Sequence, residues 1–235
     1  MNDQLLDVLN EFLGTLEEVE ILLTSAEINI GEEIKYVTYN KSALLLLSGK
    51  FENFVELIAE QYVFLVNNLN LRSSLLPEIM RLHHTYSIIT KLEKYQSTNQ
   101  INDAKKVLSQ IGTLWVTDHN FNKLEIECKF SYGKHGEKEL TKLFSPIGIS
   151  DVFVEVEVFI PNENLDDEKT KKVDFKGIFN SVMNMRNNIL HQDASPSLTH
   201  DSIRKYKLIF ANFAEAITTL LDKNLQALIE IANVN

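Results

Sequence analysis

The chain has 235 residues, of which 44% are hydrophobic, enough to bury a sizeable core in one large domain or two small ones. Its 33 acidic and 23 basic residues give a net charge of −10, which excludes the broadly basic surface of a general nucleic-acid coat protein. Any polyanion must therefore be bound locally. The single cysteine, Cys128, excludes an internal disulfide and a multi-cysteine zinc site.

The first residues, MNDQLLDVLNEFL, carry no positive leader, and no apolar run approaches the roughly 20 residues of a membrane span. With one cysteine, these features favour a soluble protein of the reducing cytoplasm, with no membrane partner.

Apolar residues recur at spacings of three and four through much of the first half, which predicts helices. The first helix is expected over 2–25 and a long central helix over 32–66. Pro77 suits the first turn of a third helix that runs to about Tyr95, because proline has no N–H to leave unpaired there. A shorter helix is expected over Ile101–Gly112. The stripe of the first helix consists of Leu5, Leu9, Phe12, Leu16, Val19 and Leu23.

The middle third changes to a period of two, which is typical of strands. Residues 123–132 and 151–160 are expected to form a small antiparallel pair, or one strand and an extended loop. A short helix is expected over 136–144, and the charged stretch 162–172 is expected to be an exposed connection.

Helical spacing then returns in a helix that carries Phe175 through Ile189. After a break at 192–200, a last long helix carries Ile203 through Ile231, with Thr199 as its N-cap. The sequence therefore predicts a mainly α-helical single domain over 1–235, with an insertion of short strands at 113–170.

Arg186 lies on the apolar side of the helix that carries it, inside the arc of Phe179, Val182 and Ile189. A guanidinium in that setting needs a carboxylate, a phosphate or a water-filled cleft. An internal salt bridge, for instance to Glu52 of the central helix, is one interpretation, and a functional site is the other.

His191 follows five positions later and would not share Arg186's face in a continuous helix, whereas Asn187 would share that of His191. Arg186 and His191 can converge only if the helix ends near Leu190 and the chain turns. A histidine at a helix end can also simply cap the helix or neutralise its dipole.

The stretch RNNILH, on a late helix of a helical chain, resembles the Arg-x4-His signature of the HEPN superfamily. Three further stretches are similar to its RiboL-PSP-HEPN branch, so that the resemblance extends from about Lys35 onward. They are YNKSALLLLSGKFENFVELIAEQY, LTKLFSPIGISDVF and ASPSLTHDSIRKYKLIFANFAEAITTLLDKNL.

The resemblance implies a HEPN-like helical bundle and a metal-independent endoribonuclease that needs no cofactor, in which a homodimer brings two Arg-x4-His segments into one cleft. His191 would be the general base or acid, Arg186 would bind the phosphoryl oxygens, and Asn187 and Glu52 would support them. Such proteins act as toxins or phage-defence effectors, with RNA as substrate and, in some systems, an antitoxin or defence partner protein. Asp193 stands where some relatives have a tyrosine that is adenylylated, so that control route is not expected.

Two other readings remain open. A non-catalytic HEPN-like module that binds RNA, a nucleotide or a protein would use Arg186 only as an internal pair. A metal-dependent nuclease could use Asp118 with Glu127 and Lys129, an arrangement that holds Mg²⁺ in some enzymes. Basic residues just after the motif could form a local RNA-binding patch or a solvated helix face: Arg204, Lys205 and Lys207.

Overall fold

The computed structural model describes residues 1–98, 100–116, 118–121, 123–130, 135–162, 169–192 and 196–234. Within these ranges the chain is mainly α-helical, as predicted, with eight α-helices and one two-stranded sheet. No helix in this part of the chain combines the length and apolarity needed to cross a lipid bilayer.

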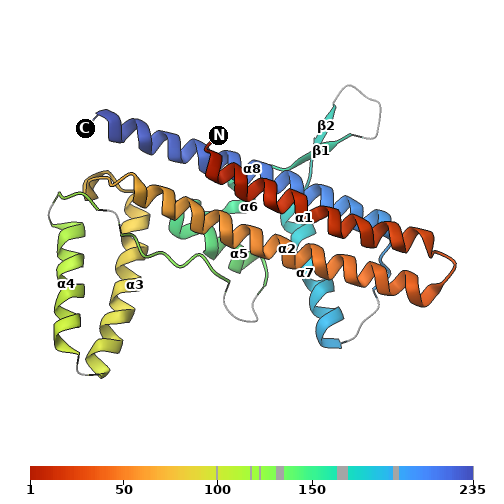
Figure 1. Ribbon diagram of the computed structural model, residues 1–235, viewed down its shortest axis with the longest axis horizontal. Coiled ribbons are helices and arrows are strands. Elements are labelled where there is room, and N and C mark those ends of the chain that lie inside the picture. Colours follow the sequence, from red (N-terminus) through yellow and green to blue (C-terminus); the bar gives the residue numbers. More distant parts are fainter. Residues whose placement is uncertain are drawn as a thin grey trace.

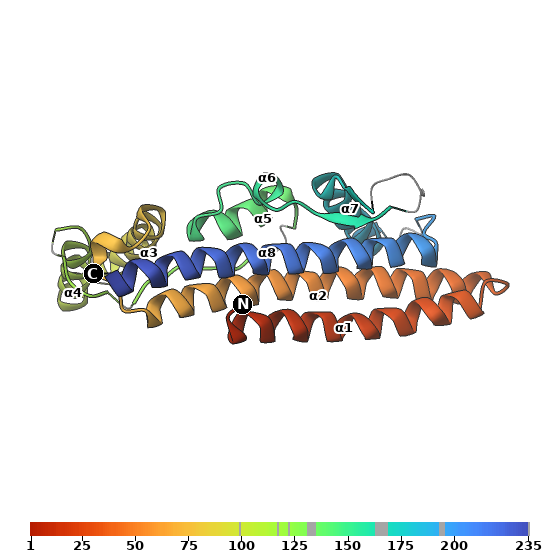
Figure 2. The same cartoon turned by 90° about the horizontal axis from the view of Figure 1, so that it is seen from above.

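Three long helices form the body of the molecule (Figures 1 and 2). They are α1 (Asp3–Ile28), α2 (Glu33–Asn68) and α8 (His200–Val234). Helices α2 and α8 run in the same direction and α1 runs opposite to them (Figure 1). The predicted stripe of α1 is the buried face of that helix, from Leu5 to Leu23.

Shorter elements extend from this body or cover it. Helices α3 (Glu78–Ser97) and α4 (Ile101–Trp115) form a hairpin at one end of the molecule, and α7 (Phe175–Gln192) packs across α2 and α8 (Figure 1). Helices α5 (Glu137–Phe144) and α6 (Val152–Glu155) lie on the same side of the body as α7 (Figure 2).

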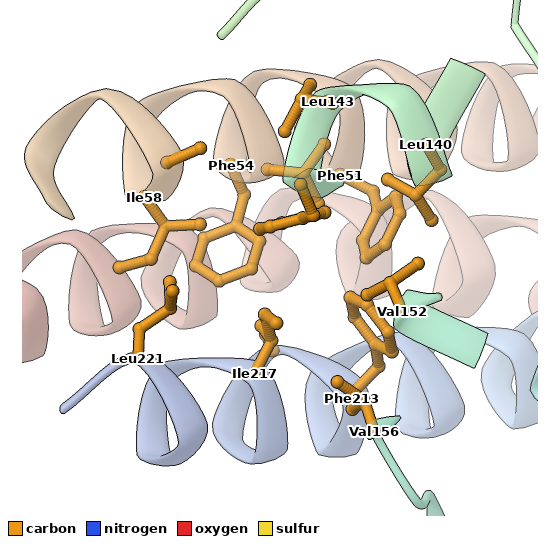
Figure 3. Packing of buried hydrophobic residues seen from close by; sticks show 14 of the residues in the cluster. Phe51, Phe54, Ile58, Leu140, Leu143, Val152, Val156, Phe213, Ile217 and Leu221 are labelled. Atoms are coloured by element: carbon orange, nitrogen blue, oxygen red, sulfur yellow. The ribbon is translucent and has the colours of Figure 1, made fainter. Parts of the chain in front are cut away.

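The core lies between α1, α2 and α8, and α5 and α6 cover the part of it that Figure 3 shows. Leu140 of α5 and Val152 of α6 point toward Phe51 of α2 and Phe213 of α8, and all four side chains are buried. Burial of large apolar side chains, at about 1.5 to 3 kcal/mol for each, is therefore the main force that joins segments far apart in the sequence.

The expected strand at 151–160 is correct only in part. Residues 152–155 form a helical turn instead, because the Asp151 carboxylate accepts the N–H of Phe153 and the Glu155 carboxylate accepts that of Asp151. This turn leaves Val154 exposed.

Burial alternates from Val156 onward, and the sheet consists of β1 (Phe159–Pro161) and β2 (Thr170–Lys172) in antiparallel register. Strand β2 falls in the stretch expected to be a connection.

Residues 123–130 are not a strand. Their backbone groups bond to helix side chains: the N–H and C=O of Leu124 bond to Asn67, and the N–H of Glu125 donates to His84. This segment therefore matches the expected extended loop rather than the expected pair of strands. Parts of three predicted segments, 131–132, 163–168 and 193–195, lie outside the described residues.

Candidate functional site

Arg186 lies on α7 with 16% of its side chain exposed, facing Glu52 of α2. Its Nη2 donates to Glu52 Oε2 at 3.4 Å, and its Nη1 donates to Asn187 Oδ1 at 3.3 Å. A guanidinium has five N–H donors, so these two long contacts leave most of its hydrogen-bonding capacity unused among the described residues. The predicted internal carboxylate partner is therefore present, but it satisfies only part of the guanidinium.

The aromatic core fixes the position of this pair. Phe179 and Val182, on the same side of α7 as Arg186, are fully buried. The Phe179 ring lies 5.9 Å from the ring of Phe51, which directly precedes Glu52 on α2. Packing of α7 on α2 through these rings therefore brings a guanidinium and a carboxylate together at the edge of the core.

Burial raises the pKa of Glu52 to about 7, although the positive charge of Arg186 acts in the opposite direction. Only 13% of its side chain is exposed. The carboxylate of Glu56, one turn further along α2, adds to the increase in pKa. Glu52 therefore holds or releases its proton near neutral pH, where ordinary glutamates are ionised.

His135, just before α5, is a third member of the cluster. Its Nδ1 lies 2.8 Å from Glu52 Oε1, but off the line that a hydrogen bond requires, and neither atom has another hydrogen-bond partner among the described residues. Burial lowers the pKa of His135 and the charge of Arg186 lowers it further, while Glu56 raises it. No spacing in the sequence connects His135 to Arg186, so no local pattern predicts that this residue joins the site.

His191 is exposed on the last turn of α7. The condition for Arg186 and His191 to converge, a helix that ends near Leu190, is not met, because α7 continues to Gln192. In a continuous helix five residues correspond to about 140° of rotation and about 7.5 Å of rise. Within one chain, then, Arg186, Asn187 and Glu52 are brought together, and the helix directs His191 to another side.

The alternative metal site is not assembled. Asp118 accepts hydrogen bonds from Ser74, whereas Lys129 Nζ lies 3.6 Å from Glu60. In the described parts of the chain, no three or more His, Cys, Asp or Glu side chains are grouped so as to hold a metal ion.

The basic stretch after the motif, considered either as an RNA-binding patch or as a solvated helix face, is largely neutralised by α1. Arg204 donates to Glu20 and to Glu27, each at 2.8 Å, and Lys207 also binds Glu20. Burial acts to raise the pKa of Glu20, but hydrogen bonds from Lys207 and Arg204 outweigh it and lower that pKa. These residues join α8 to α1 and leave Lys205 as the exposed basic residue of the stretch.

The model of the family RiboL-PSP-HEPN matches residues 10–223 of the chain. This range includes every member of the cluster as well as His191. Comparisons with curated proteins and with solved structures gave no match.

Proposed function

Because the chain belongs to the RiboL-PSP-HEPN family, we propose that it is a metal-independent endoribonuclease in which Arg186 and His191 act on RNA. RNA carries its own nucleophile, the 2′-OH beside each phosphate, so cleavage needs only a proton acceptor, a proton donor and stabilisation of the phosphoryl oxygens.

In the proposed reaction an imidazole takes the proton of the 2′-OH as that oxygen attacks phosphorus. The bond from phosphorus to the 5′-oxygen breaks, and an imidazolium returns a proton to this leaving oxygen. The products are a 2′,3′-cyclic phosphate, or its hydrolysed form, and a 5′-OH. Histidine suits both steps because its ordinary pKa lies near neutrality.

The observation that carries this proposal is the incomplete pairing of Arg186. Its side chain is 16% exposed, and its guanidinium makes two contacts longer than 3.2 Å. A phosphoryl group could accept several of the remaining N–H groups in the bidentate manner that arginine favours, and a preorganised, partly desolvated donor stabilises developing negative charge.

A homodimer supplies what one chain lacks. Since α7 directs Arg186 and His191 to different sides, a second copy that places its own motif opposite the first would put arginine and histidine around one phosphate. Asn187, one turn before His191, would orient that imidazole or contact the ribose.

The test is digestion of purified RNA by the wild type, Arg186→Gln and His191→Gln. We expect rate losses of about 10²-fold or more for each variant, the usual effect of removing an acid–base group or an oxyanion donor. Cleavage should persist in EDTA. Arg72→Gln is a matched control, because Arg72 is an exposed arginine paired with Asp118 outside the cluster.

In a cell, the proposed role is that of a toxin or phage-defence effector held in check by an antitoxin or defence partner protein. Expression of the chain alone should slow growth, and His191→Gln should be tolerated. Equal growth of both strains would remove this role.

A non-catalytic HEPN-like module that binds RNA, a nucleotide or a protein is the second candidate. The contact of Arg186 with Glu52 inside the same chain favours it, since an internal pair is what a purely structural arginine would form. Digestion separates the two functions: equal cleavage by all three proteins, or cleavage by none, supports the binding module.

A further inference from the structure

Two polar atoms at the centre of the cluster face each other without a hydrogen bond. Glu52 Oε1 and His135 Nδ1 are buried and lie 2.8 Å apart, while Glu52 Oε2 contacts Arg186 at 3.4 Å. Buried polar atoms are normally paired, and a carboxylate beside an imidazole nitrogen becomes paired when the two share one proton and a small rotation of either side chain aligns them.

That proton sets the charge of the cluster. Without it, the guanidinium of Arg186 and the carboxylate of Glu52 cancel, and His135 is neutral. With it, these three side chains carry one net positive charge, which offsets the negative charge of the neighbouring Glu56, whether the proton lies on Glu52 or on His135. A phosphodiester is negative, so it is attracted to the protonated cluster and repelled by the free carboxylate next to Arg186.

Three other charged groups among the described residues lie near this pair or on the helices that hold it. Glu56 of α2 adds a negative charge beside the pair, and one of its carboxylate oxygens accepts the N–H of Phe130 at 2.8 Å. On α5, Glu137 is engaged by Asn180 at 2.8 Å and by Lys176 at 3.3 Å, both on the first half of α7. Arg186 is the cation that faces the pair from α7.

We propose that His135 is a positioning residue of the Arg186 site: it shares one proton with Glu52, and uptake of that proton frees Arg186 to bind a phosphodiester of RNA. This inference deepens the proposed function and rests on it for the identity of the ligand. His135 acts through Glu52, and His191 keeps the role of acid or base.

The experiment measures binding without cleavage. The probe is a fluorescein-labelled oligodeoxynucleotide, which keeps the phosphodiesters but has no 2′-OH to attack. Its affinity is measured by anisotropy from pH 5.5 to 8 for the wild type, Glu52→Gln, His135→Asn and His83→Asn. Asparagine places an amide near the position of Nδ1 but takes up no proton. His83, on α3, lies outside the cluster and serves as the control.

Wild-type affinity should fall as pH rises through neutrality, by at most about tenfold per pH unit for one linked proton. Glu52→Gln should flatten this dependence and bind at pH 8 nearly as tightly as the wild type does at pH 6. In His135→Asn the proton must reside on Glu52 alone, so the midpoint should move to lower pH, with several-fold weaker binding at pH 7. His83→Asn should follow the wild type.

A His135→Asn curve that coincides with the wild-type curve overturns the inference, as does wild-type binding that is absent or independent of pH. Loss of the proposed function looks different: the RNA digest then shows no cleavage that depends on Arg186 or His191, while proton-linked binding remains. Cleavage that needs both residues, with unchanged binding in His135→Asn, sinks only the role of His135.

Discussion

At Glu52, burial raises the pKa and the positive charge of Arg186 lowers it, and the effect of burial is the larger. Its pKa of about 7 means that the folded protein holds a proton that the unfolded chain releases near the ordinary glutamate pKa of 4.5. Between these two values the native state binds more protons than the unfolded state, so this group makes the protein less stable as pH rises.

Glu52→Gln should therefore match the stability of the wild type at pH 5 and exceed it at pH 8. The expected difference at pH 8 is on the order of 2 kcal/mol, after allowance for the part of the carboxylate that stays solvated. Urea unfolding at both pH values measures it. A difference that is the same at both pH values would contradict the raised pKa.

Among the helices, α8 begins as the sequence predicted. Thr199 Oγ1 accepts the N–H of Ser202 at 3.1 Å, which satisfies one of the first-turn donors that a helix leaves unpaired. The helix that follows lies along both α1 and α2, so its start affects the whole body of the fold.

Thr199→Ala should lower the free energy of unfolding by about 1 kcal/mol, because the first turn loses its acceptor. Thr199→Ser keeps the hydroxyl and should stay within a few tenths of a kcal/mol of the wild type. Thermal or urea denaturation of the three proteins checks this, and equal losses in both variants would show that the hydroxyl does not cap the helix.

How much the sequence revealed differs between element types. The long helices followed from apolar periodicity, because helical burial repeats along one segment and needs no knowledge of its partner. A strand needs a second strand as hydrogen-bond partner. In residues 123–130, backbone groups bond instead to the side chains of Asn67 and His84. Of the alternating apolar positions in that segment, Leu124 and Cys128 are buried, whereas Ile126 and Phe130 are only partly buried, and the period of two does not predict the hydrogen bonds of the segment.

Likewise, some residues of the candidate site can be predicted from local sequence patterns and others cannot. The sequence indicates Arg186, because a charged residue there interrupts an apolar helix face. It also offers Glu52 of the central helix as a possible partner. His135 lies in the cluster because α5, which it precedes, packs against α2 and α7. No local sequence pattern encodes that packing. The contact of His135 with Glu52 is visible only when the packing is known.

Across the whole molecule, Phe51 joins the elements that hold the site. Its ring is fully buried and lies 4.5 Å from the ring of Phe210 and 5.5 Å from that of Phe213, both on α8. It also meets Phe12 of α1 and Phe179 of α7.

Phe51→Ala should lower the free energy of unfolding by about 3 to 5 kcal/mol, because it leaves a cavity where three helices meet α7. Phe51→Leu, which fills more of the space, should cost less. Denaturant unfolding compares them. A loss below 1 kcal/mol in Phe51→Ala would show that the surrounding helices collapse onto the site.

The proposed dimer leads to a prediction on the scale of the assembly. Light scattering should give about twice the chain mass of 26.9 kDa. If two copies complete one site, specific RNA-cleaving activity should fall when the protein is diluted until it dissociates. A monomer with constant specific activity would contradict the shared cleft.

That residues 1–235 form a single domain also stays a prediction.

The adjacency of Phe51 and Glu52 on α2 has one more consequence. A slide of α2 against α7 by one helical turn is about 5.4 Å, which exceeds the 3.4 Å between Glu52 Oε2 and Arg186 Nη2. In one direction this slide would bring Glu56 toward Arg186 in place of Glu52, so the packing of Phe51, rather than the attraction between opposite charges, sets the alignment of the two helices.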